Sequence, residues 1–149
     1  MIGWDTLYEH ALSFWGKPYI WGGDGTERYF GGYDCSGLVQ AILDKAGMDP
    51  KGDQTAQALY NHFSGRPHYK GPSHGALAFF GTEHKVTHVG FCLDDKIMIH
   101  ATGGGSHVTS TEKAKRVNAS VQITPIKYRP DCVGILLPDY SGRVTFPYG

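Results

Sequence analysis

Long apolar runs are missing from this 149-residue sequence, which has no stretch approaching the roughly 20 apolar residues that a transmembrane helix needs. The N-terminus has neither a basic segment nor an apolar core, so we expect no signal peptide and synthesis in a cytoplasm. An excess of one charge is missing too, because 14 basic and 14 acidic side chains cancel and no basic run exists. We therefore expect no nucleic acid and no membrane among the partners.

Cysteine is scarce as well. The three cysteines are an odd number and form no CxxC pair, which argues against a disulfide framework and a zinc ribbon. Reduced thiols fit synthesis in a cytoplasm. No glycine-rich motif has the strand and helix around it that a phosphate-binding loop requires, and no HExxH motif occurs. We therefore expect neither a cofactor nor a metal.

The length corresponds to one domain, residues 1–149, which is large enough to bury a core without staples. Segments with helical apolar spacing come first and strand-like segments follow. We expect helices at residues 4–15, 35–46 and 54–63, and strands at residues 77–80, 86–93, 97–101, 107–111, 120–126 and 133–137. This order predicts an α+β fold, with N-terminal helices packed on a five- to six-stranded antiparallel sheet. Residues 64–75 are predicted to be a turn-rich loop and residues 138–149 a surface tail.

The first helix is predicted from an apolar stripe that stops before Gly16. Its members recur at i, i+3, i+4, i+7, i+8 and i+11, as one buried helix face requires: Trp4, Leu7, Tyr8, Ala11, Leu12 and Trp15. We expect their aromatic rings to pack in the core.

A cysteine stands where a glycine-rich loop, residues 22–33, turns into a helix. Asp34 is a natural N-cap residue, which places Cys35 at the first helical position. Unpaired N–H groups and the positive end of the helix dipole favour a thiolate there and can also hold a developing oxyanion. We therefore interpret Cys35 as a candidate nucleophile, and the alternative is an inert packing cysteine.

A nucleophilic cysteine needs a base, and two of the eight histidines lie inside apolar strand patterns. If the loop around Asp94 has odd length, Phe91 opposes Ile97 on an apolar face and His88 opposes His100 on the other. His88 would then take the thiol proton and later protonate the leaving amine, while His100 fixes the tautomer of His88. We expect a thiolate–imidazolium ion pair. The alternative for the cysteine and the two histidines is a zinc site.

Six segments together resemble NlpC/P60 cysteine peptidases, in the order found in that family. They are Tyr19-Ile20-Trp21-Gly22-Gly23, Asp34-Cys35-Ser36-Gly37-Leu38-Val39, Gln54-Thr55-Ala56-Gln57, Gly75-Ala76-Leu77-Ala78-Phe79-Phe80, His88-Val89-Gly90 and Ile99-His100-Ala101. One departure is the stretch Gly75-Ala76-Leu77, where the family often has Gly-Asp-Leu. The resemblance implies a papain-like fold and hydrolysis of a peptidoglycan stem-peptide amide through an acyl-enzyme. The usual bond joins D-γ-glutamyl to meso-diaminopimelate (or Lys).

The resemblance also implies roles for individual residues. Three match the family's catalytic positions, as nucleophile, base and third polar residue: Cys35, His88 and His100. Three more match positions that bind the substrate or the oxyanion: Tyr19, Asp34 and Ser36. Residues 102–118, which contain three consecutive glycines, are predicted to be a loop that can cap the site.

The implied partner is the peptidoglycan stem peptide, and we expect the protein to be a monomer. With no signal peptide and no wall-binding module visible, we expect a phage endolysin, a phage tail component or an injected effector that acts on the bacterial cell wall after release. Two alternatives stay open. One is an amidase or deamidase that acts on protein glutamines, and the other is a non-catalytic phage tail or structural protein with this fold.

Overall fold

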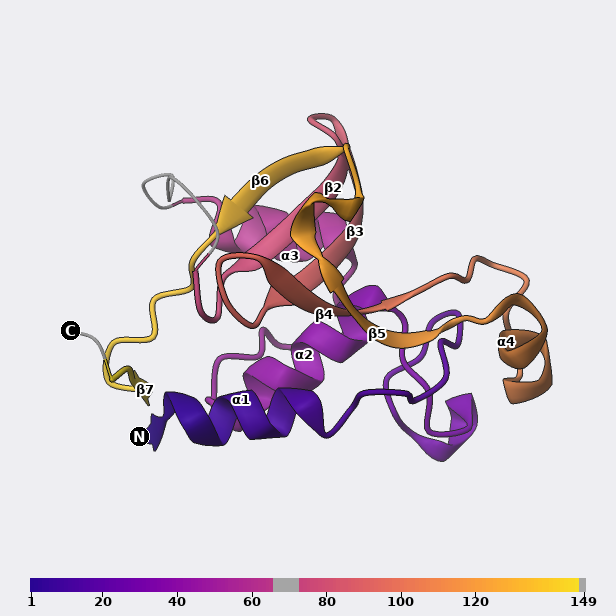
Figure 1. Cartoon of the computed structure of the whole chain (residues 1–149), viewed down its shortest axis with the longest axis horizontal. Coiled ribbons are helices and arrows are strands. Elements are labelled where there is room, and N and C mark those ends of the chain that lie inside the picture. The colour runs from indigo at the N-terminus through magenta and orange to yellow at the C-terminus, as the bar shows by residue number, and fades with distance from the viewer. Residues whose placement is uncertain (66–72, 148–149) are drawn as a thin grey trace.

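The computed structural model describes residues 1–65 and 73–147, in which helices pack on a five-stranded antiparallel sheet (Figure 1). The helices are α1 (Trp4–Leu12), α2 (Cys35–Lys45), α3 (Ala56–Phe63) and α4 (Thr111–Val117). The sheet has the order β5-β4-β3-β2-β6 and consists of β2 (Leu77–Thr82), β3 (Lys85–Cys92), β4 (Ile97–Thr102), β5 (Ser120–Pro125) and β6 (Cys132–Leu136). The expected α+β class is confirmed. Most of the loop expected at residues 64–75 lies outside the described residues.

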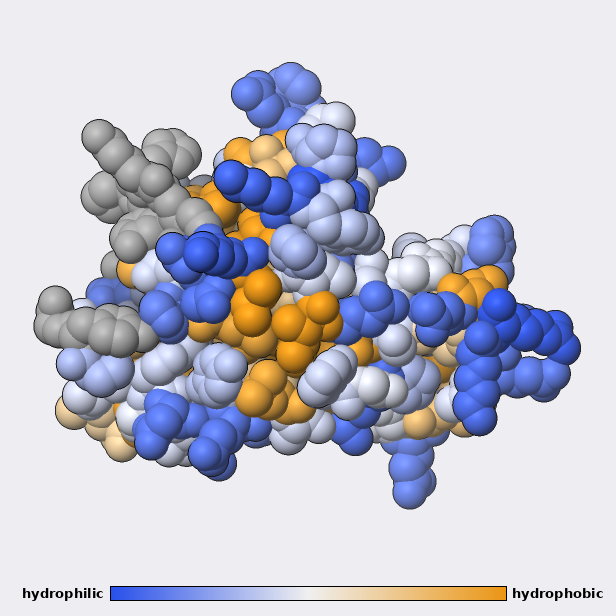
Figure 2. Space-filling model, in the orientation of Figure 1, coloured by the Kyte–Doolittle hydropathy of each residue, from blue (hydrophilic) through white to orange (hydrophobic). Residues whose placement is uncertain are grey.

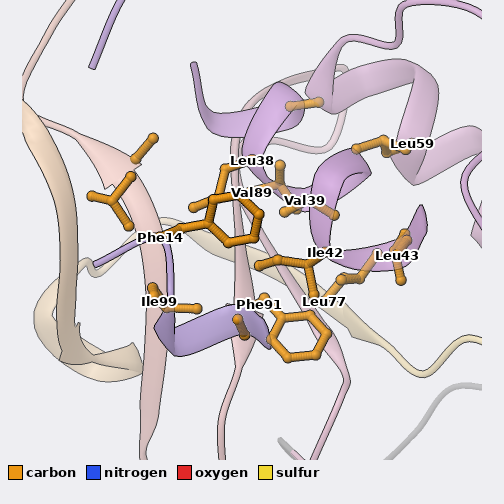
Figure 3. Close-up of a cluster of buried hydrophobic side chains, with 14 of the residues drawn as sticks. Phe14, Leu38, Val39, Ile42, Leu43, Leu59, Leu77, Val89, Phe91 and Ile99 are labelled. Atoms are coloured by element: carbon orange, nitrogen blue, oxygen red, sulfur yellow. The ribbon is translucent and has the colours of Figure 1, made fainter. Parts of the chain in front are cut away.

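Helix α2 carries the centre of the core, where it meets one face of the sheet (Figure 3). Four of its side chains, spaced as the sequence predicts, are completely buried: Leu38, Val39, Ile42 and Leu43. Side chains of alternate positions on the sheet pack against them: Leu77, Val89, Phe91 and Ile99. Burying each side chain of this size contributes roughly 1.5–3 kcal/mol. This interface therefore fixes where the first turn of α2 lies relative to β3.

Helix α1 is shorter than its apolar stripe predicts. It ends at Leu12, and the turn that follows directs Phe14 inward instead of its neighbour. Phe14 is 7% exposed, whereas Trp15 is 65% exposed. The expectation that Trp15 packs in the core is therefore wrong, because the helical spacing does not continue past residue 12.

The segment that precedes β5 contains a helix where the sequence suggested a strand. Residues 107–110 form no strand, and α4 begins after Ser110, whose Oγ accepts a hydrogen bond from the N–H of Lys113. Asn118 ends the helix in the left-handed conformation, with φ of +56°. Only Ala114 of α4 is buried, and this end of the molecule shows hydrophilic side chains next to a smaller hydrophobic patch (Figure 2). The loop expected at residues 102–118 thus includes a short surface helix.

The C-terminal segment is not the surface tail that the sequence suggested. Tyr140 and Val144 are 5% and 6% exposed, and the Tyr140 hydroxyl donates a hydrogen bond of 2.6 Å to the carbonyl of Gly75. Strand β7 (Val144–Thr145) pairs in parallel with β1 (Ile2–Gly3), which brings the beginning and end of the described chain together (Figure 1). The segment is too short and too polar for its buried positions to be recognised from periodicity.

The hairpin between β3 and β4 has a register two residues away from the expected one. Phe91 pairs with Ile99, where Ile97 was expected. The cause is a longer loop, because the Asp94 carboxylate accepts hydrogen bonds from the N–H groups of Lys96 and Ile97 at 2.7 and 2.9 Å. A shift of two residues changes the partners but leaves every side chain on its expected face.

None of the helices within residues 1–65 and 73–147 combines the length and apolar character needed to cross a membrane.

Candidate active site

Asp34 caps α2, as the sequence predicts, and Cys35 is the first residue of the helix. Oδ1 of Asp34 accepts a hydrogen bond of 2.7 Å from the N–H of Gly37. The glycine-rich loop lies against this turn, since the carbonyl of Gly23 accepts a hydrogen bond of 3.1 Å from the N–H of Asp34. A Cβ on Gly37 would overlap that same carbonyl, so glycine is required for the loop to lie this close to the helix.

The Cys35 thiol lies at the place where the β3–β4 ladder ends. The two strands pair at two positions near their hairpin loop, although both continue beyond it. The N–H of Cys92 bonds to the carbonyl of Ala76, just before β2, so the alternate residue Val89 directs its backbone groups to the β4 side. On that side the Cys35 Sγ contacts the carbonyl of Thr87 at 3.9 Å and the N–H of Val89. The thiol therefore meets the backbone on both sides of His88.

The surroundings keep the Cys35 thiol protonated. Burial, followed by the negative charge of Asp34, raises the pKa of Cys35 from 9.0 to about 11. Nearby N–H groups, including that of Val89, favour the thiolate but do not outweigh these effects. The raised pKa of Cys35 therefore disfavours the expected thiolate–imidazolium pair in the resting protein, and the pair itself stays a prediction. The residue that caps the helix also places a carboxylate beside the thiol, and its effect opposes that of the helix dipole.

His88 and His100 meet on the face of the sheet that turns away from α2. Nε2 of His88 lies 2.8 Å from Nδ1 of His100, and the two side chains are 7% and 0% exposed. In the observed register His100 lies beside Gly90, so the side chain of His88 contacts His100 diagonally, two residues away from the directly paired position. A Cβ on Gly90 would lie 3.3 Å from the Cβ of His100 and still closer to Met98, so glycine leaves room for the two rings. The prediction that the two histidines meet is confirmed. The prediction that they lie directly opposite each other is wrong.

Both imidazoles are neutral in this environment. Burial, the neighbouring His100 and the charge of Arg129 lower the pKa of His88 to about 3, against an opposing effect of Asp131. Burial and Arg129 likewise lower the pKa of His100 to about 4. Within residues 1–65 and 73–147, the Cys35 thiol forms no hydrogen bond with either ring. The resting site thus consists of a neutral thiol next to a strand that carries a neutral base.

Sequence reasoning missed an ion pair beside the histidines. Arg129 donates hydrogen bonds of 2.9 and 2.7 Å from Nε and Nη2 to the two carboxylate oxygens of Asp131. Its guanidinium lies 5.1 Å from the ring centre of Phe80, and it also interacts electrostatically with Cys35. The pair lies in the connection between a short 3₁₀ turn, η2 (Ile126–Tyr128), and β6. No motif in the sequence marks this connection.

Thr124 of β5 was missed as well. Its Oγ1 lies 2.8 Å from Nε2 of His100, on the side of that ring opposite His88. The ring of Tyr128 lies nearby, with its centre 5.9 Å from that of His100. A threonine in a β-rich segment is ordinary, so the sequence gives no signal for this contact.

The residues expected to bind the substrate or the oxyanion surround the same end of α2. Burial, followed by the charges of Cys35 and Asp34, raises the pKa of Tyr19 well above 10, so its hydroxyl remains a donor. Ser36 is buried and donates a hydrogen bond of 3.3 Å to Oδ1 of Asp34, the oxygen that also caps the helix. Burial raises the pKa of the Asp34 carboxyl.

All three thiols are free, and the remaining two cysteines lie on the sheet. Cys92 is buried in a small apolar cluster on the far face of the sheet, and Cys132 is exposed on β6. Across the part of the chain that the structure describes, no group of three or more His, Cys, Asp or Glu side chains is arranged to hold a metal ion.

Comparisons with known proteins find similarity over most of the chain. The model of the NlpC/P60 family matches residues 16–124. The bifunctional muramidase/DL-endopeptidase CwlT of Bacillus subtilis is 34% identical over 106 residues, which cover 68% of this chain and 30% of that protein. The probable endopeptidase p60 of Listeria grayi is 29% identical over 104 residues, 67% of this chain and 18% of that protein. The chain therefore spans less than a third of the length of either relative.

A solved structure has the same fold. The P60 domain of the M. avium subspecies paratuberculosis antigen MAP1204 has a TM-score of 0.61 and 24% identity to this chain. The alignment covers 90% of this chain and 95% of that domain. The NlpC/P60 fold expected from the sequence is thereby confirmed.

Proposed function

The chain belongs to the NlpC/P60 family, and from this membership we propose that it is a cysteine peptidase that hydrolyses an amide bond in the stem peptide of peptidoglycan. The names of its relatives, a DL-endopeptidase and an endopeptidase, support this class of reaction. One observation carries the proposal: the Cys35 thiol lies against the backbone on both sides of His88, whose ring is held by His100.

Cys35 is the proposed nucleophile and His88 the proposed base. Nε2 of His88 is engaged by His100, which leaves Nδ1 to receive the thiol proton. Sulfur then attacks the carbonyl carbon of the substrate, and the amide nitrogen leaves with the proton held by His88. Water attacks the resulting thioester after giving a proton to His88. The acid product leaves, and that proton returns to the sulfur.

The electrostatics favour proton transfer that accompanies attack rather than a preformed thiolate. The pKa of Cys35 is raised and that of His88 is lowered, so an ion pair is unfavourable before substrate binds. When the tetrahedral intermediate forms, its oxyanion needs donors at the start of α2. The backbone N–H of Cys35 and the protonated hydroxyl of Tyr19 are the proposed donors.

Asp34 and Ser36 are proposed to bind the free amine at the end of a stem peptide. Oδ1 of Asp34 is already used by the helix cap and by Ser36, so the second oxygen is the one available to an ammonium group. A cationic partner offsets the cost of removing a carboxylate from water, so the partly buried Asp34, whose pKa is raised, favours such a ligand.

The proposed bond joins D-γ-glutamyl to meso-diaminopimelate or Lys. The test is mass spectrometry of purified stem peptides of both kinds after incubation with wild type, Cys35→Ala and the matched control Cys132→Ala, which removes an exposed thiol of β6. We expect cleavage after D-γ-Glu by wild type and the control only. Cleavage at another amide would keep the mechanism and change the specificity. If wild type cleaves neither kind of stem, the function is wrong, and protein substrates or a structural role become the next hypotheses.

The setting in which the domain meets the cell wall stays a prediction. The two relatives come from Bacillus subtilis and Listeria grayi. The expected phage origin and monomeric state are part of the proposal, and size-exclusion chromatography with light scattering tests the second.

A further inference from the structure

Three polar side chains form one slanted row across three neighbouring strands. In the register between β4 and β5, His100 is opposite Gln122, yet it bonds to Thr124, two residues further along. On the other side His100 stands beside Gly90, yet it bonds to His88, two residues earlier. Each contact is 2.8 Å. The two diagonal steps run in the same direction, so the row is continuous from β3 to β5.

The hydrogen atoms in this row have only two consistent arrangements. If Nε2 of His100 donates to the Thr124 hydroxyl, Nδ1 of His100 must accept from Nε2 of His88, and Nδ1 of His88 keeps its lone pair. If the hydroxyl donates to His100, every bond is reversed and Nδ1 of His88 carries a hydrogen. Only the first arrangement leaves a base that can take a proton from a thiol.

The Thr124 hydroxyl selects the first arrangement. It has a second acceptor within reach, the carbonyl oxygen of Pro125 at 3.4 Å, to which it donates while accepting from His100. His100 is 0% exposed, so water does not compete for its Nε2–H. Without an acceptor at residue 124, that N–H would be buried unpaired, and the ring would lower its energy by moving the hydrogen to Nδ1.

The charged groups around the row do not decide between the two arrangements of hydrogen atoms, so the Thr124 hydroxyl decides. Arg129 and Asp131 face the histidines from the connection before β6, and Tyr128 faces His100 from η2. Cys35 approaches from α2 as a neutral thiol. Arg129 disfavours a second proton on either ring, and the carboxylate of Asp131 is already paired with Arg129. Each ring therefore carries one hydrogen.

We propose that Thr124 is a positioning residue that sets the tautomers of His100 and His88 and so keeps Nδ1 of His88 free to act as the base. The effect on catalysis rests on the proposed function, whereas the tautomers themselves do not. Within residues 1–65 and 73–147, no hydrogen bond joins Thr124 to the Cys35 thiol. Thr124 acts through His100 alone.

The first test needs no substrate. Long-range ¹H–¹⁵N correlation spectra of histidine-labelled wild type at pH 7 distinguish a protonated ring nitrogen from an unprotonated one. We expect both His88 and His100 to carry hydrogen on Nε2. In Thr124→Val we expect hydrogen to move to Nδ1 in a measurable fraction of both rings, while Thr124→Ser resembles wild type. A wild-type spectrum with Nδ1–H on either ring overturns the proposal, whether or not the valine variant folds.

The second test uses the stem-peptide assay. Loss of one hydrogen bond predicts about a tenfold fall in kcat for Thr124→Val, with KM unchanged. Thr124→Ser should restore kcat to within about twofold of wild type. Thr145→Val, the same exchange at an exposed position of β7, is the matched control and should have no effect. An unchanged kcat in Thr124→Val overturns the proposed role. If wild type cleaves no stem peptide, the proposed function fails, and the spectra still decide the tautomers.

Discussion

The neutral histidine pair should make the folded protein sensitive to acid at a pH where most carboxyl groups are still ionised. In the unfolded chain a histidine has its ordinary pKa of 6.5, whereas burial lowers the folded values to about 3 for His88 and about 4 for His100. Below pH 6.5 the two imidazoles therefore bind protons in the unfolded chain but not in the folded protein. Stability from this source is fully present above pH 6.5 and is lost as the pH falls towards the folded pKa values.

The size of the effect follows from linkage. A group that titrates at 6.5 when unfolded and below 5 when folded reduces the free energy of unfolding by about 2 kcal/mol between pH 7 and pH 5. The two histidines together predict a loss of about 4 kcal/mol. This predicted loss hardly depends on how far below 5 the pKa values of the folded protein lie, because at pH 5 both rings of the folded protein are still unprotonated.

Urea unfolding at pH 7 and pH 5 measures this loss. The comparison is between wild type and the double variant His88→Gln, His100→Gln, in which glutamine keeps polar groups at both positions but does not titrate. All other titrating groups are present in both proteins, so the difference between the two pH-dependent changes isolates the pair. We expect wild type to lose about 4 kcal/mol more than the double variant. Equal losses within about 1 kcal/mol would refute the neutral pair and with it the neutral-base mechanism.

Three further predictions concern single residues. Asp34→Asn retains a side chain that can cap α2 but removes the charge beside the thiol, so Cys35 should react faster with iodoacetamide at pH 8 than in wild type; a slower reaction would contradict the electrostatic reasoning. Gly90→Ala adds a methyl group against the facing strand and should cost about 1–3 kcal/mol in urea unfolding and lower kcat, whereas Gly105→Ala, in open space, should do neither. Tyr140→Phe leaves the buried carbonyl of Gly75 without its donor and should lower the free energy of unfolding, measured in urea, by about 1–3 kcal/mol. A change near zero would support the original prediction that this segment is a surface tail.

The parts of the fold with strong periodicity were predictable from the sequence. The apolar positions of α2 recur over three turns between an N-cap aspartate and Gly47, which has a φ of +69°, so both the helix and the place of Cys35 follow. The shared face of His88 and His100 follows from strand alternation alone. Their exact pairing does not, because a carboxylate–backbone contact at Asp94 adds two residues to the loop without changing the faces.

Other features depend on contacts that sequence patterns do not encode. Helix α4 was not predicted, because its seven residues, of which one alanine is buried, show no apolar period. The raised pKa of Cys35 depends on how far the thiol is removed from water, an effect that exceeds that of the nearby N–H groups. Thr124 and Arg129 reach the histidines from strands and turns that are distant in sequence, and only the three-dimensional arrangement identifies them.

The proposed nucleophile and base belong to different layers of the molecule. The thiol is fixed to the first turn of α2 and the imidazole to β3, and no hydrogen bond joins the two side chains in the described structure. Their separation is therefore set by the thickness of the apolar packing beneath them. A displacement of about 1 Å in a reacting pair can lower a rate about 100-fold. The rate of turnover therefore depends on the spacing between the helix and the sheet. A truncation such as Leu38→Ala should reduce kcat at temperatures where the variant is still fully folded.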